Sequence, residues 1–162
     1  AVMHVVSAGG ARTVNGVTFA REYDPLQNVS LLTIQLPSTR KLYYVNPQVG
    51  VNRFGSASIN YMGQNQMTKK WQRVETYGGK LTENIVQAIA RDALALAIEH
   101  LEAAGLPVIF HIHDECVIDC PAFGTPDEML DHVTHLMTRP IPWAQGLPLN
   151  ADGWVGTFFK KD

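Results

Sequence analysis

The chain has 162 residues, of which 46% are hydrophobic and 17% charged, and its formal net charge is −2. This length and composition are sufficient for a folded chain with a hydrophobic core, and they exclude a largely disordered protein. The slightly acidic balance excludes binding to nucleic acid through bulk positive charge, so any such contact requires a local basic patch.

The first half of the chain predicts antiparallel strands. Residues 1–28 are weakly patterned and predict a frayed end followed by a loop. Residues 29–36 and 40–45 predict a hairpin around a turn at 37–39, ended by Asn46-Pro47. Residues 57–62 and 68–76 predict a second pair of strands, and Gly78-Gly79 predicts a break after it.

The second half predicts helix, hairpin, helix and strand. Apolar residues recur at helical spacing over 80–104, with Thr82 as the expected N-cap and Gly105 followed by Pro107 as the end. Residues 125–137 predict a second helix opened by a capping box of Thr125 and Glu128. Residues 153–160 predict a last strand. We therefore expect an α/β (α+β) fold with an antiparallel sheet.

The run from Val108 to Cys120 predicts two short strands joined at Asp114-Glu115, the second strand running from Cys116 to Pro121. Asp-Glu suits a tight turn poorly, because two-residue turns need positive φ and favour Asn-Gly, Asp-Gly or Gly-X. A turn that breaks this rule is a candidate functional site, and two adjacent carboxylates suit a hard cation such as Mg²⁺. An exposed polar turn explains the same residues equally well.

Two histidines and two cysteines share one face of this predicted hairpin: His111, His113, Cys116 and Cys120. Such a set raises the alternative of a zinc site, with His113 and Cys116 as cross-strand partners. Cys120 would lie ~13 Å along the strand from Cys116, too far to join one zinc ion or to form a disulfide. Packed thiols and a packed histidine are the favoured interpretation, and unpaired cysteines favour a reducing, cytoplasmic setting.

Two further groups could contact nucleic acid. Asn84, Gln87 and Arg91 are spaced three and four apart on one helix face, and amide side chains suit base edges in a minor groove. The alternative is a solvated helix face, which is favoured without further context. Lysines and an arginine flank Trp71 and could hold phosphates while the ring stacks on a base. Lysines that protect an edge strand from pairing with another chain explain the same residues equally well. These basic residues are Lys69, Lys70 and Arg73.

Three stretches carry a resemblance to a known family. They are Thr82-Glu83-Asn84-Ile85-Val86-Gln87-Ala88-Ile89-Ala90-Arg91-Asp92, then His111-Ile112-His113-Asp114-Glu115, and a tail formed by residues 139–149, 153–154 and the ending Lys160-Lys161-Asp162. From about Tyr77 onward the chain resembles the C-terminal palm of family A DNA polymerases, the DNA polymerase I type, in its phage and prophage branch. Residues 36–38, 42–44 and 61–66 resemble the linking segment of the same phage enzymes.

The resemblance implies template-directed transfer of a nucleotide to a primer 3′-hydroxyl by two-metal catalysis with Mg²⁺. Asp114 would be the metal ligand of motif C, Glu115 would assist the metal or position the primer end, and His113 would lie near the primer terminus. Gln87 would read the minor groove, with Asn84 and Arg91 as weaker counterparts. The implied partners are primer-template DNA and deoxynucleoside triphosphates. The implied domains are a linking segment, 1–78, and the C-terminal half of a palm, 79–162.

The chain departs from the family in having no motif A, a strand followed by Asp-Tyr-Ser, and no motif B helix. Together with a first residue other than Met, this predicts a fragment that is inactive without the remaining polymerase segment. The alternatives are a non-catalytic DNA-binding remnant and a metal-dependent nuclease using Asp114 and Glu115, although no third carboxylate or general base is placed to help. A truncated palm should expose apolar surface, which predicts a homodimer. No apolar run approaches the ~20 residues of a membrane-spanning helix, so no membrane partner is expected.

Overall fold

The computed structural model describes residues 1–120 and 124–159. Pro121, the predicted end of the second hairpin strand, and the ending Lys160-Lys161-Asp162 lie outside the described residues. The chain forms two compact units, Ala1–Ile89 and Ala90–Asp162. Each unit contains a buried cluster of its own hydrophobic residues. The expected domain boundary at residues 78/79 stays a prediction.

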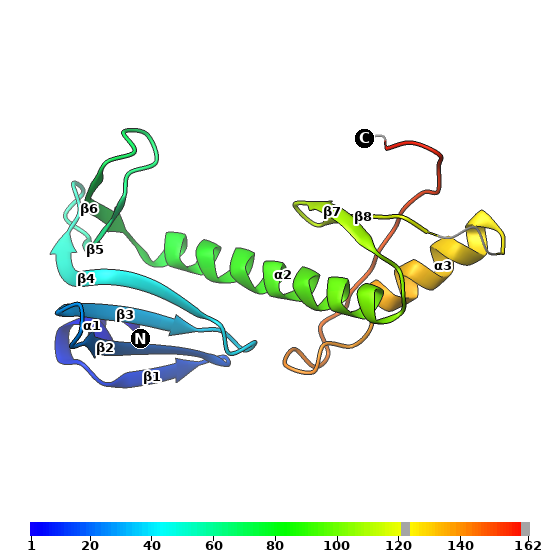
Figure 1. The fold of residues 1–162 in the computed structure, drawn as a ribbon. Coiled ribbons are helices and arrows are strands. Elements are labelled where there is room, and N and C mark those ends of the chain that lie inside the picture. Colours follow the sequence, from blue (N-terminus) through cyan, green and yellow to red (C-terminus); the bar gives the residue numbers. More distant parts are fainter. Residues whose placement is uncertain (121–123, 160–162) are drawn as a thin grey trace. The chain divides into compact units, whose positions relative to one another are not determined.

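The first unit is a helix and a six-stranded antiparallel sheet in which each strand pairs with the next (Figure 1). The sheet confirms the strands expected over 29–36, 57–62 and 68–76. Its elements are α1 (Val2–Ala8), β1 (Ala11–Val14), β2 (Val17–Asp24), β3 (Val29–Gln35), β4 (Lys41–Val51), β5 (Ala57–Gln64) and β6 (Trp71–Thr76).

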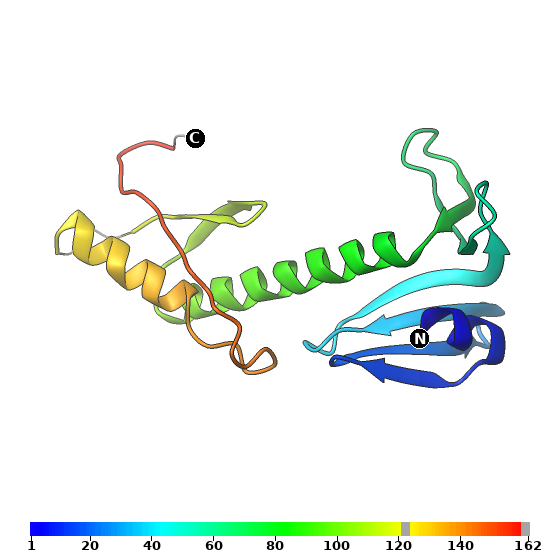
Figure 2. The ribbon, with the colours of Figure 1, turned by 180° about the vertical axis from the view of Figure 1, so that it is seen from behind.

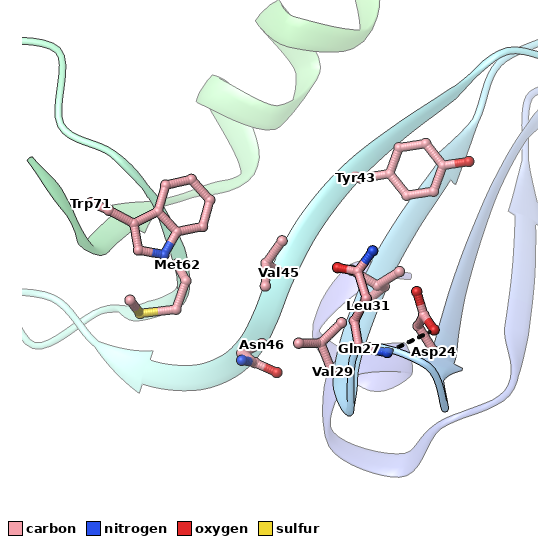
Figure 3. Close-up of a pocket in the computed structure, with 9 residues that line it drawn as sticks. All are labelled: Asp24, Gln27, Val29, Leu31, Tyr43, Val45, Asn46, Met62 and Trp71. Atoms are coloured by element: carbon pink, nitrogen blue, oxygen red, sulfur yellow. Dashed lines mark hydrogen bonds between the residues drawn. The ribbon is translucent and has the colours of Figure 1, made fainter. Parts of the chain in front are cut away.

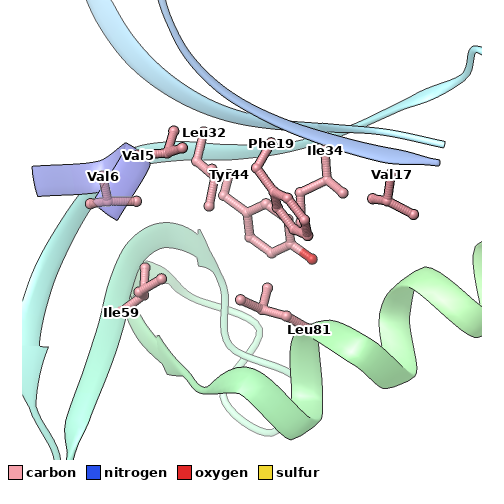
Figure 4. Packing of buried hydrophobic residues seen from close by; sticks show 9 residues of the cluster. All are labelled: Val5, Val6, Val17, Phe19, Leu32, Ile34, Tyr44, Ile59 and Leu81. Carbon is pink, nitrogen blue, oxygen red and sulfur yellow. The ribbon is translucent and has the colours of Figure 1, made fainter. Parts of the chain in front are cut away.

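The loop expected over residues 1–28 is wrong, because this segment forms α1, β1 and β2. Val5 of α1 and Phe19 of β2 are buried in the core of the first unit (Figure 4). Asn15 and Gly16, which join β1 to β2, both have positive φ. Asn-Gly is the strongest short-range signal for a hairpin, and it is the feature that could have predicted these strands.

Strand β4 does not end at Asn46-Pro47 as expected but continues to Val51. Its pairing with β5 shifts register between Val45 and Gln48, which marks a β-bulge. Asn46 has positive φ, and its side-chain Oδ1 accepts a hydrogen bond from the Ser30 amide at 3.1 Å. Proline is tolerated at a bulge because its nitrogen has no hydrogen to offer the ladder.

Helix α2 (Gly78–Ala103) begins in the first unit and ends in the second. Thr82 is not its N-cap, because the helix already begins at Gly78 and the Thr82 hydroxyl donates to the Gly78 carbonyl at 3.0 Å. The expected end is confirmed. The Gly105 amide donates to the Glu102 carbonyl and the Leu106 amide to the Leu101 carbonyl, which is the Schellman pattern that a residue with positive φ allows.

The second unit continues with a two-stranded antiparallel sheet and a helix: β7 (Val108–Ile112), β8 (Glu115–Ile118) and α3 (Pro126–Met137). Leu101 of α2 and two residues of α3, Met129 and Leu136, are buried in one cluster with Leu106. Side chains of the hairpin pack against that cluster, so both helices support β7 and β8. The expected α/β class with an antiparallel sheet is confirmed.

The N-terminus of α3 agrees with the sequence prediction, whereas the last segment of the described chain does not. The Thr125 capping box is present, with Thr125 Oγ1 accepting from the Glu128 amide and the Glu128 carboxylate accepting from the Thr125 amide. The strand expected over 153–160 is wrong, since residues 153–159 have no regular secondary structure. Phe159 instead packs edge-on against Phe110 of β7. Strand propensity alone does not make a strand when no neighbouring strand pairs with it.

Within the described residues, no helix is long and apolar enough to cross a membrane. In Figure 2 the sheet of the first unit is seen from behind, with α1 against its strands.

Candidate functional site

The turn of the β7–β8 hairpin lies one residue earlier than the sequence predicted. Ile112 pairs with Glu115 and His111 with Cys116, so the two central residues of the turn are His113 and Asp114. His113 has a φ of 53°. Histidine adopts positive φ more readily than most residues, which explains how the turn forms without glycine. Glu115 is therefore the first residue of β8 rather than part of the turn.

The tip of the hairpin presents three functional groups to solvent. His113, Asp114 and Glu115 are all exposed. Among the described residues, none forms a hydrogen bond or an ion pair with these three side chains. Chain adjacency brings them together, and they can contact a partner without breaking an internal bond.

The base of the hairpin, in contrast, is tied to the end of α2. The Val108 amide donates to Glu102 Oε1 at 2.7 Å, and the Asp119 amide donates to the Pro107 carbonyl at 3.1 Å. Val108 and Ile118 also pack on the buried cluster of the second unit. The anchored base positions the tip while leaving its carboxylates accessible.

Arg91 of α2 reaches the hairpin within the second unit. Its Nη2 lies 3.5 Å from His111 Nε2, and His111 lies opposite Cys116 on the neighbouring strand. Burial raises the pKa of the Cys116 thiol, and the nearby Arg91 guanidinium acts in the opposite direction. The expected pairing of His113 with Cys116 is wrong, because the turn is displaced by one residue. Both Cys116 and Cys120 are free thiols.

The two carboxylates at the tip have the donor chemistry that Mg²⁺ prefers. Mg²⁺ is commonly held by one or two carboxylates together with waters and substrate phosphates, and Asp114 and Glu115 can supply the carboxylates. Over residues 1–120 and 124–159, no group of three or more His, Cys, Asp or Glu side chains could enclose a metal ion.

The residues predicted to face a minor groove differ in how they are held. Asn84 is half-buried, and its Nδ2 donates to the Tyr44 hydroxyl at 3.0 Å within the first unit. Gln87 is exposed, and its Nε2 donates to Glu83 Oε1 at 3.3 Å. Asn84 therefore has a hydrogen-bond partner inside the fold. The side-chain amide of Gln87 can give up its surface hydrogen bond to Glu83 and bind a ligand instead.

The predicted basic group lies at and beside the turn between β5 and β6. Lys69 and Lys70 are exposed, and within the described chain their ammonium groups form no ion pair. Asn65 Oδ1 stabilises the turn by accepting hydrogen bonds from the backbone amides of residues 67 and 68 at 3.0 and 2.9 Å. Arg73 Nη1 donates to the Asn46 carbonyl at 2.7 Å, which fixes its guanidinium against the sheet. The turn presents two exposed ammonium groups beside Trp71, whose side chain is 63% exposed.

The amino-acid sequence was compared with those of known proteins, and it is similar to that of a DNA polymerase. It is similar to a protein described as a DNA polymerase from Bacillus phage SP02, with 46% identity over 149 residues. The match covers 91% of this chain and 22% of that polymerase, so the chain spans about a fifth of its relative's length. No model of a protein family matches the chain, and no solved structure does. The chain is homologous to a segment of a phage DNA polymerase.

Proposed function

We propose that this chain is the palm portion of a family A DNA polymerase and carries motif C on the β7–β8 hairpin. The observation that carries the proposal is the 46% identity to a phage DNA polymerase over 149 residues, a stretch covering 91% of the chain. The exposed His113-Asp114-Glu115 tip, held by an anchored base, supports it. Primer-template DNA and deoxynucleoside triphosphates are the proposed partners.

In this proposal Asp114 and Glu115 would hold Mg²⁺, and the ion would act as a Lewis acid toward the 3′-hydroxyl and the phosphate. Asp114 is the metal ligand, Glu115 assists the metal or orients the primer end, and His113 lies near the primer terminus. Gln87 reads the minor groove, where the acceptors of A·T and T·A pairs are alike. A side chain there can sense the shape of a base pair without choosing a sequence.

Catalysis in this proposal requires a further polymerase segment with motifs A and B. Two metal ions ~3.5–4 Å apart need ligands on both sides, and the hairpin tip supplies one side. The chain spans 22% of its polymerase relative, which leaves most of that protein for the other motifs. We therefore expect the isolated chain to bind DNA weakly and not to extend a primer. A reducing cytoplasmic location and self-association through exposed apolar surface complete the proposal.

A segment exchange tests this function. The matching segment of the phage SP02 polymerase is replaced by the present chain, and Mg²⁺-dependent primer extension is measured. We expect extension by the exchanged enzyme and a loss of about 100-fold or more with Asp114→Asn, because the substitution removes a negatively charged group that would hold Mg²⁺.

Asp119→Asn is the matched control, since Asp119 is also exposed and lies beyond the other end of β8. The control should retain extension. Equal activity of both variants would refute the role of Asp114. A folded exchanged enzyme that binds DNA but never extends a primer would favour the non-catalytic remnant instead. Primer extension by the isolated chain would contradict its dependence on a further segment.

A further inference from the structure

The sheet of the first unit has one covered face and one open face. Buried side chains from β2, β3 and β4 pack with α1 and with Leu81 at the start of α2 on the covered face. Side chains alternate between faces along a strand, so the residues next to these buried positions belong to the open face. Thr33 and Ser58 on this face are each 1% exposed, so the face is open only in part. Tyr43, beside the buried Tyr44, is 57% exposed.

Strand pairing aligns the apolar residues of the open face across four strands. Leu31 of β3 pairs with Val45 of β4, and Val45 pairs with Met62 of β5. Trp71 of β6 pairs with Gln64, two residues along β5 from Met62. Leu31, Val45, Met62 and Trp71 line a cavity of about 480 Å³ together with Tyr43 and Asp24 (Figure 3).

Two aromatic rings on this face are available for stacking. Trp71 is 63% and Tyr43 57% exposed, and no ring contact joins either to another described aromatic residue. They lie on strands separated by β5, roughly 10 Å apart across the sheet at the usual spacing of strands. Exposed rings on an open sheet bind successive bases, because every base has a face that can stack.

The charge around Trp71 is positive. Lys69 and Lys70 precede it on the turn, and Arg73 follows it on the same face of β6. Three acidic residues share this face. Glu22 pairs with Lys41 at 2.7 Å. Asp24 lines the cavity, and its Oδ1 accepts hydrogen bonds from the amides of residues 26 and 27. Glu75 lies farther along β6.

We propose that this open face, defined by Tyr43, Met62, Trp71, Lys69 and Lys70, binds single-stranded nucleic acid. The two rings stack on bases, and the two lysines contact phosphates. The inference rests on the proposed function in taking nucleic acid as the partner, and it adds a contact surface in the first unit. A duplex is disfavoured because its bases are already stacked on one another, which leaves no free face for Trp71 and Tyr43.

The test uses the full chain with a fluorescein-labelled oligo(dT) in EDTA, so that neither metal nor catalysis is involved. Binding is followed by fluorescence anisotropy at several salt concentrations. We expect Trp71→Ala and Tyr43→Ala each to weaken binding about 5- to 150-fold, the range measured for loss of one base–aromatic stack. Trp71→Phe should retain most of the affinity. A Lys69→Ala, Lys70→Ala double substitution should make the negative slope of log K against log salt shallower by about 1.4.

Tyr77→Ala and Lys80→Ala are the matched controls. Tyr77 has the same 57% exposure as Tyr43 but lies outside the sheet, and Lys80 pairs with Glu83 at 3.0 Å on α2. Both should bind like the unsubstituted chain, and circular dichroism verifies that every variant is folded. Absence of oligonucleotide binding by the folded chain would overturn the proposal, and so would wild-type affinity in the Trp71 and Tyr43 variants or equal binding of a blunt duplex. The assay needs neither metal nor primer extension, so a failure here and a failure of the polymerase test are distinguishable.

Discussion

Replacing Leu101 with alanine tests whether the buried cluster of the second unit holds the hairpin in place. Leu101 lies in the last turn of α2 and its side chain is 0% exposed. It packs in one cluster with Leu136 of α3, and Val108 and Ile118 of the hairpin pack against this cluster. The substitution leaves the backbone hydrogen bond from Leu106 to the Leu101 carbonyl available, so its effect is confined to packing.

The expected cost is about 2–5 kcal/mol, because a fully buried leucine loses its transfer free energy and leaves a cavity. This is a large part of the ~5–15 kcal/mol that stabilises a typical domain. If backbone amides of the hairpin exchange through opening of this core, their exchange should accelerate about 30-fold or more.

Urea denaturation measures the free energy of unfolding, and hydrogen exchange with peptide mapping measures protection of β7 and β8. Leu32→Ala is the matched control, since Leu32 is also 0% exposed but belongs to the buried cluster of the first unit. It should cost a similar free energy and accelerate exchange in β2 and β3. Leu147→Ala, at a side chain that is 47% exposed, should change stability by less than about 0.5 kcal/mol.

The reasoning is refuted if Leu101→Ala costs less than about 2 kcal/mol, the low end for replacing a buried leucine with alanine. It is refuted equally if Leu32→Ala accelerates exchange in β7 and β8 as much as Leu101→Ala does, because the hairpin would then not depend specifically on its own cluster.

Three further predictions follow from local features. Thr125→Ala should cost about 1 kcal/mol in thermal unfolding, since it removes the N-cap of α3. Hydrogen bonds from the backbone and side chain of Thr125 lower the pKa of Glu128, so the stabilisation that the Glu128 carboxylate adds is present at neutral pH and is lost as the pH falls through that lowered pKa; a Glu128→Gln chain with an unchanged acid limb would contradict this. Gly105→Ala should cost about 1–2 kcal/mol because Gly105 has a φ of 77°, whereas Gly78→Ala, where an added Cβ meets nothing, should be neutral or stabilising; equal effects would contradict the backbone explanation. Burial raises the pKa of Cys116, so its alkylation rate should reach half its maximum at a higher pH than that of a free cysteine, and Arg91→Ala should move this midpoint higher still; a downward movement would show that Arg91 does not act on the thiol.

Several elements could be predicted because their signals are local. The β3 strand, the β5–β6 pair and the end of α2 at Gly105 follow from alternation, turn residues and a glycine with positive φ. The capping box at Thr125 follows from two residues three positions apart. In each case the groups that satisfy the backbone lie within a few residues of one another.

The candidate site was predicted in its composition but not in its register. His113, Asp114 and Glu115 were expected at the tip of a hairpin, yet the turn was placed on Asp114-Glu115 rather than on His113-Asp114. A displacement of one residue changes which side chains face each other, because side chains alternate along a strand. The choice depends on how β7 and β8 pack against α2 and α3, and no local rule contains that information.

The sequence by itself determined the capping box of α3, the glycine end of α2, most strand segments and the exposed acidic tip, since short-range hydrogen bonding and periodicity specify them. Only the tertiary structure decided the continuation of β4 past Asn46, the exact turn of the hairpin and the open face that unites Tyr43 with Trp71. Tyr43 and Trp71 belong to different hairpins and are 28 positions apart in the chain. Strand pairing and burial of the opposite face bring them to one surface, and both are collective properties of the folded chain.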